Sequence, residues 1–250
     1  MVRDFANIQQ ASRAAAKYIL DLARYAVMDK GICTIVLAGG STPRLTYKIL
    51  SEPANAEQMP WQQVHFFWGD ERWVATTHPD SNFAMADKAL LSKVHIPPQN
   101  IHQITTGHTS PEIAAEIYEK HLRDFFHSNS MAEIKSSADD SPVPKFDLVL
   151  LGMGPDGHTA SLFPGANLLE EKKKWVAAVP HGAGTIQVPR ITLTLPVLNQ
   201  ANNILFLISG SEKREVLNTI LTLPEEAEKL YPAARIRPAG NLVWLVADNP

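Results

Sequence analysis

Apolar positions along the chain follow two patterns, helical spacing in some segments and compact runs in others. Between residues 4 and 29 the apolar side chains Ala15, Ile19 and Ala26 recur at helical spacing, which predicts an amphipathic helix that stops at Gly31. Compact apolar runs rich in β-branched and aromatic residues predict strands at 32–38, 64–68, 101–104, 146–151, 175–179, 203–208 and 242–246. Further helical patterns fall at 44–50, 83–91, 111–126 and 211–221.

Strands and helices therefore alternate, and this order predicts the fold class. Alternation of this kind is typical of a mostly parallel, doubly wound sheet with helices on both faces, a three-layer α/β/α architecture. Residues 128–145 are polar and rich in serine, acidic residues and proline, so they read as a surface loop. Because the alternation resumes unchanged after this loop, we expect one domain over residues 1–250.

Composition narrows the classes of partner. The net charge of −3 and the pI near 6.3 show no basic excess for binding nucleic acid or an anionic membrane. No apolar segment approaches the roughly 20 residues that span a bilayer, and residues 1–30 lack a secretory pattern. The single cysteine, Cys33, lies in an apolar run and is expected to be a small buried hydrophobe. These features predict a cytoplasmic protein.

The segment 146–165 contains the most unusual local sequence. Its apolar run ends in Gly152-Met153-Gly154-Pro155-Asp156-Gly157-His158, and a buried strand of this kind delivers its loop to the carboxyl edge of a parallel sheet. Histidine side chains titrate near neutrality, so His158 is a candidate general base, with Asp156 placed to orient its ring. A histidine that merely caps a short helix starting at Thr159 is the structural alternative.

Other chemistries fit this loop poorly. Residues 152–157 formally match the G-x-G-x-x-G dinucleotide motif, but Pro164 prevents the long helix that must follow it. A metal site is not expected, because the chain has no cysteine cluster and no H-E-x-x-H, and His121 and His127 lie on different helix faces. The G-x-S-x-G nucleophile elbow is also absent.

Two glycine-to-helix junctions are candidate anion sites. In Gly39-Gly40-Ser41-Thr42-Pro43, Thr42 suits the N-cap and the proline suits the first helical position, so backbone N–H groups could hold a phosphate. An ordinary capped turn is the alternative. At the second junction Ser211 is the expected cap, and Lys213 lies in the first helical turn, where a cation is unfavourable unless an anion binds there. An exposed surface lysine is the alternative.

Two arginines complete the basic groups. Arg72 ends the run Asp70-Glu71-Arg72, which lies between aromatic residues after the strand 64–68 and could bind a phosphate in bidentate fashion. Arg190 opens the extended segment ITLTLP. With Lys213, three basic side chains therefore reach the site from separate segments.

In this order, the motifs resemble the 6-phosphogluconolactonase family. They are the segments 39–43, 69–72, 80–82, 152–164, 189–192 and 210–213. The related glucosamine-6-phosphate deaminases typically have D-E-Y where this chain has Asp70-Glu71-Arg72. They also continue as I-A-F-N-E-P after the histidine, where this chain has Thr159 to Pro164. The glutamate that partners the histidine in deaminases has no counterpart here.

The resemblance implies hydrolysis of 6-phosphoglucono-1,5-lactone to 6-phosphogluconate in the oxidative pentose phosphate pathway, without an obligatory cofactor. It implies His158 as the base on water and a small phosphorylated sugar lactone as the partner. We expect a monomer with no metal site. The implied phosphate-binding residues are Gly40, Ser41, Thr42, Arg72, Arg190 and Lys213. A glucosamine-6-phosphate deaminase and a non-catalytic sugar-phosphate-binding protein are the alternatives.

Overall fold

A seven-stranded sheet forms the centre of the molecule, in a computed structural model that describes residues 1–129, 143–180 and 187–248. Its strand order is β1-β10-β9-β6-β2-β3-β5, and each neighbouring pair is parallel. The strands are β1 (Val2–Phe5), β2 (Cys33–Leu37), β3 (Val64–Trp68), β5 (Ile101–His102), β6 (Leu148–Leu151), β9 (Asn203–Ser209) and β10 (Asn241–Ala247).

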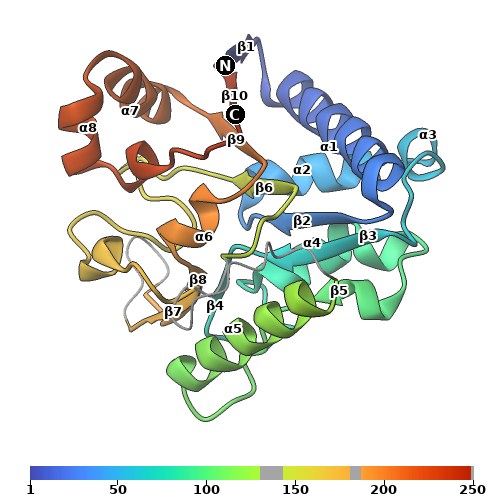
Figure 1. Cartoon of the computed structure of the whole chain (residues 1–250). Helices are drawn as coiled ribbons and strands as arrows, with labels where there is room; N and C mark the ends of the chain where they lie inside the picture. The colour runs from blue at the N-terminus through green and yellow to red at the C-terminus, as the bar shows by residue number, and fades with distance from the viewer. Residues whose placement is uncertain (130–142, 181–186, 249–250) are drawn as a thin grey trace.

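Helices cover both faces of this sheet, which confirms the predicted three-layer α/β/α class. The helices α1 (Ile8–Lys30) and α2 (Ser41–Leu50) cover one face, and α7 (Ser211–Thr222) lies on the other (Figure 1). The remaining α-helices in the described residues are α3 (Pro53–Ala56), α4 (Asn82–Ala89), α5 (Pro111–Ser128), α6 (Leu195–Asn199) and α8 (Pro224–Leu230). Within the described residues, no helix is long and apolar enough to cross a membrane.

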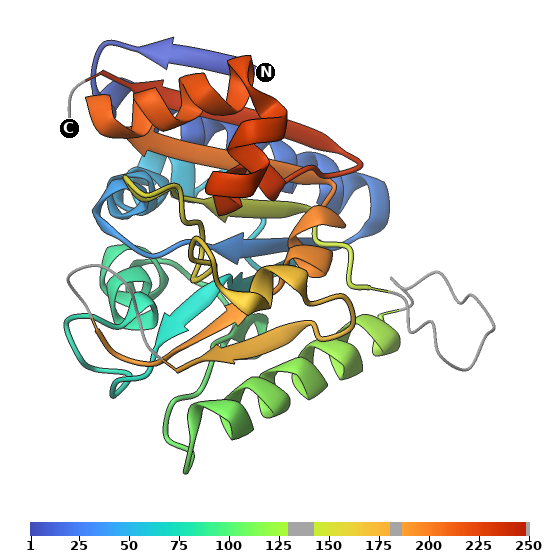
Figure 2. The ribbon, with the colours of Figure 1, turned by 90° about the vertical axis from the view of Figure 1, so that its left-hand side faces the viewer.

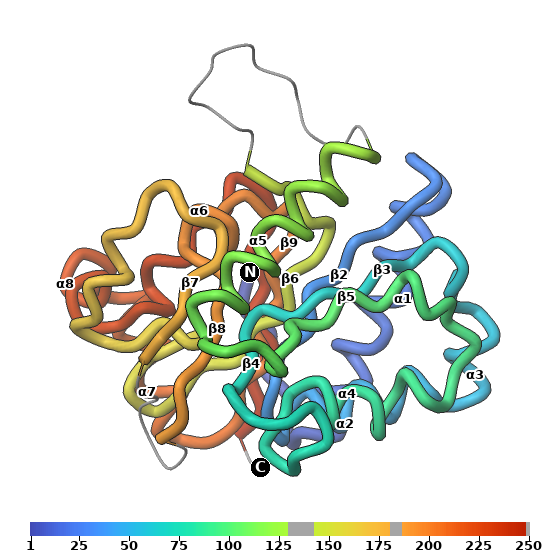
Figure 3. The backbone as a smooth tube through the Cα atoms, turned by 90° about the horizontal axis from the view of Figure 1, so that it is seen from below, coloured from blue at the N-terminus to red at the C-terminus, as the bar shows by residue number. Residues whose placement is uncertain are grey.

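A second, antiparallel sheet was not predicted. It has the order β4-β8-β7, formed by β4 (Asp70–Arg72), β8 (Arg190–Leu193) and β7 (Val176–Val179). The strand predicted at 175–179 therefore belongs to this sheet and not to the main one. The small sheet lies beside the main sheet on the side away from α1 and α2, with α5 packed along it (Figures 2 and 3). Because β4 follows β3 after a single glycine, the chain leaves the main sheet at its carboxyl edge.

Several predicted boundaries differ from the observed ones. The first helix begins at Ile8 instead of residue 4, because Val2–Phe5 pairs with β10 as an edge strand and Asn7 caps the helix by accepting a hydrogen bond from the Gln10 N–H. The helix predicted to end at residue 126 continues to Ser128. Most of the predicted loop 128–145 lies outside the described residues.

The central strand β6 is buried along its whole length, as its apolar sequence predicts. Asp147, directly before it, is also buried, and its carboxylate accepts hydrogen bonds from the N–H and hydroxyl of Thr34 at 2.9 and 3.0 Å. Lys30 forms an ion pair with the same carboxylate at 2.8 Å. This network joins the amino ends of β2 and β6. Cys33 is buried, as expected.

Three histidines form a hydrogen-bonded chain between β3, β5 and α5. His102 Nε2 lies 2.9 Å from His65 Nδ1, and His102 Nδ1 lies 2.7 Å from His121 Nε2. The ring of His102 stacks on Phe67 at a centroid distance of 4.3 Å. Burial lowers the pKa of His102 to about 3, and it also lowers the pKa of His65 and His121, although Asp124 opposes the shift at His121. The three histidines are therefore neutral at physiological pH in the folded protein.

We expect acid to destabilise the fold by protonating these buried histidines. Below pH 6.5 His102 binds a proton in the unfolded protein but stays neutral in the folded protein until the pH approaches 3. The free energy of unfolding therefore falls as the pH is lowered from 6.5 towards 3. At pH 5 the loss from this one group is about 2 kcal/mol. Urea unfolding at pH 7.5 and 5 checks this for the wild type and for His102→Phe, which retains the stacked ring. An equal pH dependence in both proteins would contradict the prediction.

Candidate functional site

A cavity of about 290 Å³ opens at the carboxyl edge of the main sheet. Most of its walls come from the segments that follow β2, β3, β6 and β9, which are adjacent strands in the sheet, and Arg190 of β8 adds to them. The chain adds strands in one direction from β2 and in the other from β6, so the cavity lies at the topological switch point where open α/β sheets bind ligands. Seven of the eight predicted site residues line it, and the eighth, Asp156, lies behind His158.

His158 and Asp156 form a hydrogen-bonded pair in the loop after β6. Asp156 Oδ1 lies 2.5 Å from His158 Nδ1 and also accepts a hydrogen bond from the His158 N–H at 3.2 Å. This contact fixes the orientation of the ring. Because a carboxylate accepts hydrogen bonds, the tautomer that fits this contact carries its proton on Nδ1 and donates it to Asp156. His158 lines the cavity with its ring 29% exposed, so Nε2 remains as the basic nitrogen.

No helix begins at Thr159, which removes the structural alternative for His158. Residues 159–162 instead form a tight turn in which Thr159 and Leu162 exchange backbone hydrogen bonds at 3.3 and 2.9 Å. Ala160, inside this turn, has a φ of 47° and is the one non-glycine residue with positive φ in the described chain. The close approach of the imidazole to the loop depends on Gly154, because a Cβ there would overlap His158 Nδ1.

Both glycine junctions start their helices without a side-chain cap, so the predicted caps were wrong. The helix α2 begins at Ser41 with Gly40 as N-cap, and α7 begins at Ser211 with Gly210 as N-cap. These glycines have φ values of 99° and 100°, a region that residues with a Cβ rarely adopt. Among the described residues no side-chain oxygen accepts a hydrogen bond from the first-turn N–H groups of α2. The N–H groups of Ser41 and Thr42 are therefore available at the cavity for an anion.

Arg72 and Arg190 are direct cross-strand partners in the small sheet. Like charges in this position repel each other, which an anion between them would relieve. Arg72 donates from Nη1 to the backbone oxygen of Asp80 at 2.8 Å, while its buried Nε has no hydrogen-bond partner among the residues that the structure describes. Arg190 is buried, and burial lowers its pKa while the nearby carboxylate of Asp70 opposes that shift.

Lys213 reaches the cavity from the first turn of α7. Burial lowers its pKa, and the neighbouring Glu212 opposes the shift. It is half-buried, so the alternative of a fully exposed surface lysine is wrong. Among the described residues that line the cavity, Asp70 is the only carboxylate. The lining cations Arg72, Arg190 and Lys213 therefore outnumber the lining carboxylates by two.

Sequence reasoning assigned no role to several residues that build this site. Phe163 places its ring 4.9 Å from the His158 ring and 5.6 Å from the Arg190 guanidinium. Glu71 is buried and accepts four hydrogen bonds, three from the N–H groups of Arg72, Asn82 and Phe83 and one from the Ser81 hydroxyl, so it caps α4. The position of the run 70–72 between aromatic residues was the available signal for this burial.

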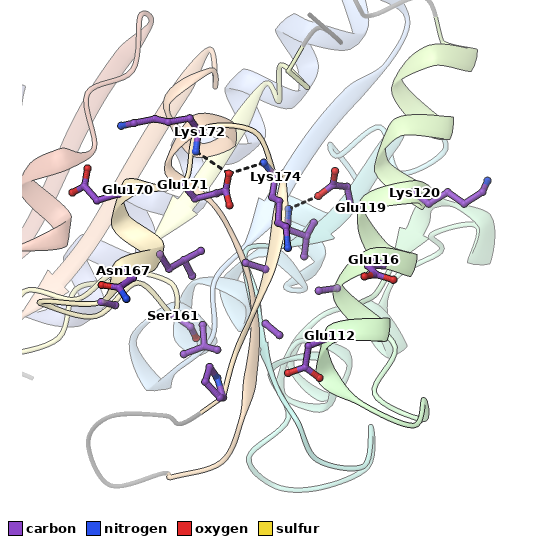
Figure 4. A pocket seen from close by; sticks show the side chains of 18 of the residues that line it. Glu112, Glu116, Glu119, Lys120, Ser161, Asn167, Glu170, Glu171, Lys172 and Lys174 are labelled. Atoms are coloured by element: carbon purple, nitrogen blue, oxygen red, sulfur yellow. Dashed lines mark hydrogen bonds between the residues drawn. The ribbon is translucent and has the colours of Figure 1, made fainter. Parts of the chain in front are cut away.

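A larger hollow of about 1230 Å³ lies nearby, between α5 and β7 (Figure 4). None of the eight predicted site residues lines it. Two of its carboxylates have structural tasks. Glu119 accepts hydrogen bonds from the N–H groups of Trp175 and Val176, and Glu171 accepts three from residues 172–174. Among the described residues that line the hollow there is no histidine, and its four cations are outnumbered by six carboxylates. The smaller cavity is therefore the better candidate for an anionic substrate.

Comparison with known proteins agrees with the resemblance in the sequence. A family model described as glucosamine-6-phosphate isomerases/6-phosphogluconolactonase matches residues 6–244. The chain belongs to this family. Its relatives include a 6-phosphogluconolactonase of Nostoc sp., which is 40% identical over 88% of this chain and 84% of its own length. A 6-phosphogluconolactonase of Arabidopsis thaliana, 6-phosphogluconolactonase 3, chloroplastic, is 38% identical over 94% of this chain and 69% of its own.

Solved structures of the family have the same fold. A 6-phosphogluconolactonase from Trypanosoma brucei is 33% identical, with a TM-score of 0.83 over 99% of this chain and 95% of its own. A monomeric glucosamine-6-phosphate deaminase gives a TM-score of 0.76 at 19% identity, a likeness that concerns the fold alone. The relatives confirm the predicted enzyme class, a hydrolase of the 6-phosphogluconolactonase type.

Proposed function

We propose that this protein hydrolyses 6-phospho-D-glucono-1,5-lactone to 6-phospho-D-gluconate. The observation that carries the proposal is the single cavity in which the His158–Asp156 pair faces Arg72, Arg190 and Lys213. A histidine held by a carboxylate suits proton transfer, and an excess of two cations suits a phosphate dianion. We further propose that the reaction belongs to the oxidative pentose phosphate pathway and that the protein is a cytoplasmic, single-domain monomer.

His158 is the general base in the mechanism that we propose. Its Nε2 takes a proton from a water molecule, whose oxygen attacks the lactone carbonyl carbon. The tetrahedral intermediate then expels the ring oxygen, and the imidazolium returns the proton to that oxygen, so the enzyme is regenerated. Asp156 holds Nδ1 and stabilises the imidazolium while the charge exists.

The 6-phosphate positions the lactone in this proposal. The phosphate is bound by the side chains of Arg72, Arg190 and Lys213. It is also bound by the backbone at the start of α2, where Gly40 is the N-cap and Ser41 and Thr42 offer their first-turn N–H groups. Binding energy from this non-reacting group is used to place the carbonyl beside the base.

We assign the oxyanion stabiliser to backbone N–H groups in the loop after β6, where few of these groups are candidates. Gly154 and Gly157 donate their N–H groups to backbone oxygens inside the loop, at 2.9 and 3.0 Å. Pro155 has no N–H to donate. We therefore propose the N–H groups of Gly152 and Met153, which line the cavity, as the stabilisers of the developing oxyanion.

Replacing Lys213 by methionine is expected to weaken binding of the phosphate group of the substrate. We expect KM for the phosphorylated lactone to rise about 10–100-fold, the value of one charge-assisted contact, while the rate with unphosphorylated 1,5-gluconolactone is unchanged. Steady-state kinetics with both lactones measures this. Lys48→Met, an exposed lysine in the last turn of α2, is the matched control. Equal losses on both lactones would remove Lys213 from phosphate binding.

A substrate comparison tests the proposed function itself. Freshly generated 6-phosphogluconolactone, unphosphorylated 1,5-gluconolactone and glucosamine 6-phosphate are supplied in parallel, with rates corrected for spontaneous lactone hydrolysis. We expect the phosphorylated lactone to give the highest kcat/KM and glucosamine 6-phosphate to release no ammonia. Ammonia release would favour a deaminase, and binding of 6-phosphogluconate without turnover of any substrate would favour a non-catalytic binding protein.

A further inference from the structure

The carboxylate of Asp70 joins three segments that meet at the cavity. Asp70 opens β4 and its side chain is only 9% exposed. Its Oδ2 accepts a hydrogen bond from the Ser161 hydroxyl at 2.6 Å, and its Oδ1 accepts one from the Asn82 amide at 3.2 Å. Arg190 Nη1 lies 3.9 Å from the same Oδ2. Both carboxylate oxygens therefore have partners on other segments.

The Ser161 contact holds the turn that follows His158. Ala160 adopts a left-handed backbone conformation in this turn, which costs about 1 kcal/mol or more for a residue with a Cβ. Such a conformation persists only where its surroundings hold it. Ser161 supplies two ties, its hydroxyl to Asp70 and its N–H to the Thr192 hydroxyl at 3.2 Å. Ser161 thus ties the turn after His158 to a carboxylate that lies 91 residues away in the sequence.

The Asn82 contact reaches the glycine loop after β2. The amide of Asn82 donates both to the backbone oxygen of Asp70 at 2.8 Å and to its carboxylate. The same amide packs against Gly39, where an added Cβ would overlap it. Asp70 therefore touches the support of the proposed phosphate loop, the turn beside the proposed base, and a proposed phosphate ligand.

We propose that Asp70 is a positioning residue, which sets the place of His158 through Ser161 relative to Arg190 and the glycine loop. The inference rests on the proposed function for its kinetic consequences. Both carboxylate oxygens of Asp70 accept hydrogen bonds from neighbouring segments, and the contacts with Ser161 and Asn82 carry the positioning role. Its contribution is geometric, and a shift of about 1 Å at the reacting groups can cost about 10²-fold in rate.

Removing the Ser161 hydroxyl is the smallest change that breaks the hydrogen bond between Ser161 and Asp70. In Ser161→Ala we expect kcat for the phosphorylated lactone to fall about tenfold or more, while Kd for 6-phosphogluconate stays within about twofold. The double variant Asp70→Asn/Ser161→Ala is expected to have the kcat of Asp70→Asn alone within about twofold, because both changes break one link. The proposal would be overturned if the kcat loss of the double variant equalled the product of the two single losses. It would also be overturned if Ser161→Ala kept the full kcat.

Asp147 provides a matched control for loss of stability. It is a second buried carboxylate with several donors, but it lies at the amino ends of β2 and β6, away from the cavity. Asp147→Asn is expected to lower the melting temperature and to keep kcat within about twofold, since its contacts do not reach the site. If Asp147→Asn lost as much kcat as Asp70→Asn, general destabilisation would explain both and the proposal would fail.

A readout without substrate separates this proposal from the proposed function. The ring resonances of His158, assigned by their absence in His158→Gln, are compared by NMR in the wild type, Ser161→Ala and Asp70→Asn. We expect both variants to shift these resonances and Asp147→Asn to leave them in place. A wild type without lactone hydrolysis would defeat the proposed function alone, whereas unshifted resonances in both variants would defeat the positioning role.

Discussion

His158→Ala is expected to lower kcat for the phosphorylated lactone by about 10²–10⁴-fold, the usual contribution of a positioned general base. The variant loses the nitrogen proposed to take the proton from water, while the cations proposed to hold the phosphate are untouched. Kd for 6-phosphogluconate should therefore remain within about threefold of the wild-type value, because alanine removes none of the proposed phosphate ligands. Stopped-flow or coupled kinetics gives kcat, and calorimetry gives Kd.

Two companion variants make this result specific. Asp156→Asn retains the size of the side chain but not its charge, so it should lose part of the rate that His158→Ala loses. His95→Ala replaces an exposed histidine outside the cavity and should behave as the wild type. Unchanged turnover in His158→Ala would remove His158 from the mechanism.

Gly154→Ala should come close to the loss of His158→Ala, although it alters no chemical group. A Cβ at this position would overlap His158 Nδ1 and Asp156 Oδ1, so the proposed pair must move apart. Displacement by about 1 Å is expected to reduce kcat by about 10²-fold or more. The φ of Gly154 is not positive, so alanine fits the backbone there and the melting temperature should change little.

Gly107→Ala is the matched control for this variant. No atom lies within 4 Å of a Cβ added at Gly107, and its φ is also not positive. Its kcat and melting temperature should equal those of the wild type. Full activity in Gly154→Ala would show that the imidazole need not occupy the position in which the structure holds it.

The main sheet and most of the cavity could be predicted from local sequence. Buried strands of a parallel sheet bring their carboxyl ends to one edge, so the loops at Gly40, Arg72, His158 and Lys213 were expected to meet once the strands were recognised. The helix starts were displaced by one or two residues, because Gly40 and Gly210 serve as caps where a hydroxyl side chain was expected.

The small sheet and the supports of the site could not be predicted in the same way. The strands β4 and β8 are short and pair across more than a hundred residues, so no local pattern indicates that Arg72 lies opposite Arg190. Asp70 and Ser161 are far apart in the sequence and meet only in the folded chain, where β4 of the small sheet follows β3 of the main sheet after Gly69. Gly154 looked like part of a nucleotide motif, whereas the structure uses its missing side chain to admit an imidazole.

The decay of freshly generated 6-phosphoglucono-1,5-lactone tests the central claim most directly. NMR follows the disappearance of the lactone and the appearance of 6-phosphogluconate in buffer alone, with the wild type, and with His158→Gln at equal concentration. The account predicts that the wild type accelerates this conversion well above the spontaneous rate and that His158→Gln loses nearly all of the acceleration. Decay at the spontaneous rate in the presence of the wild type would contradict it.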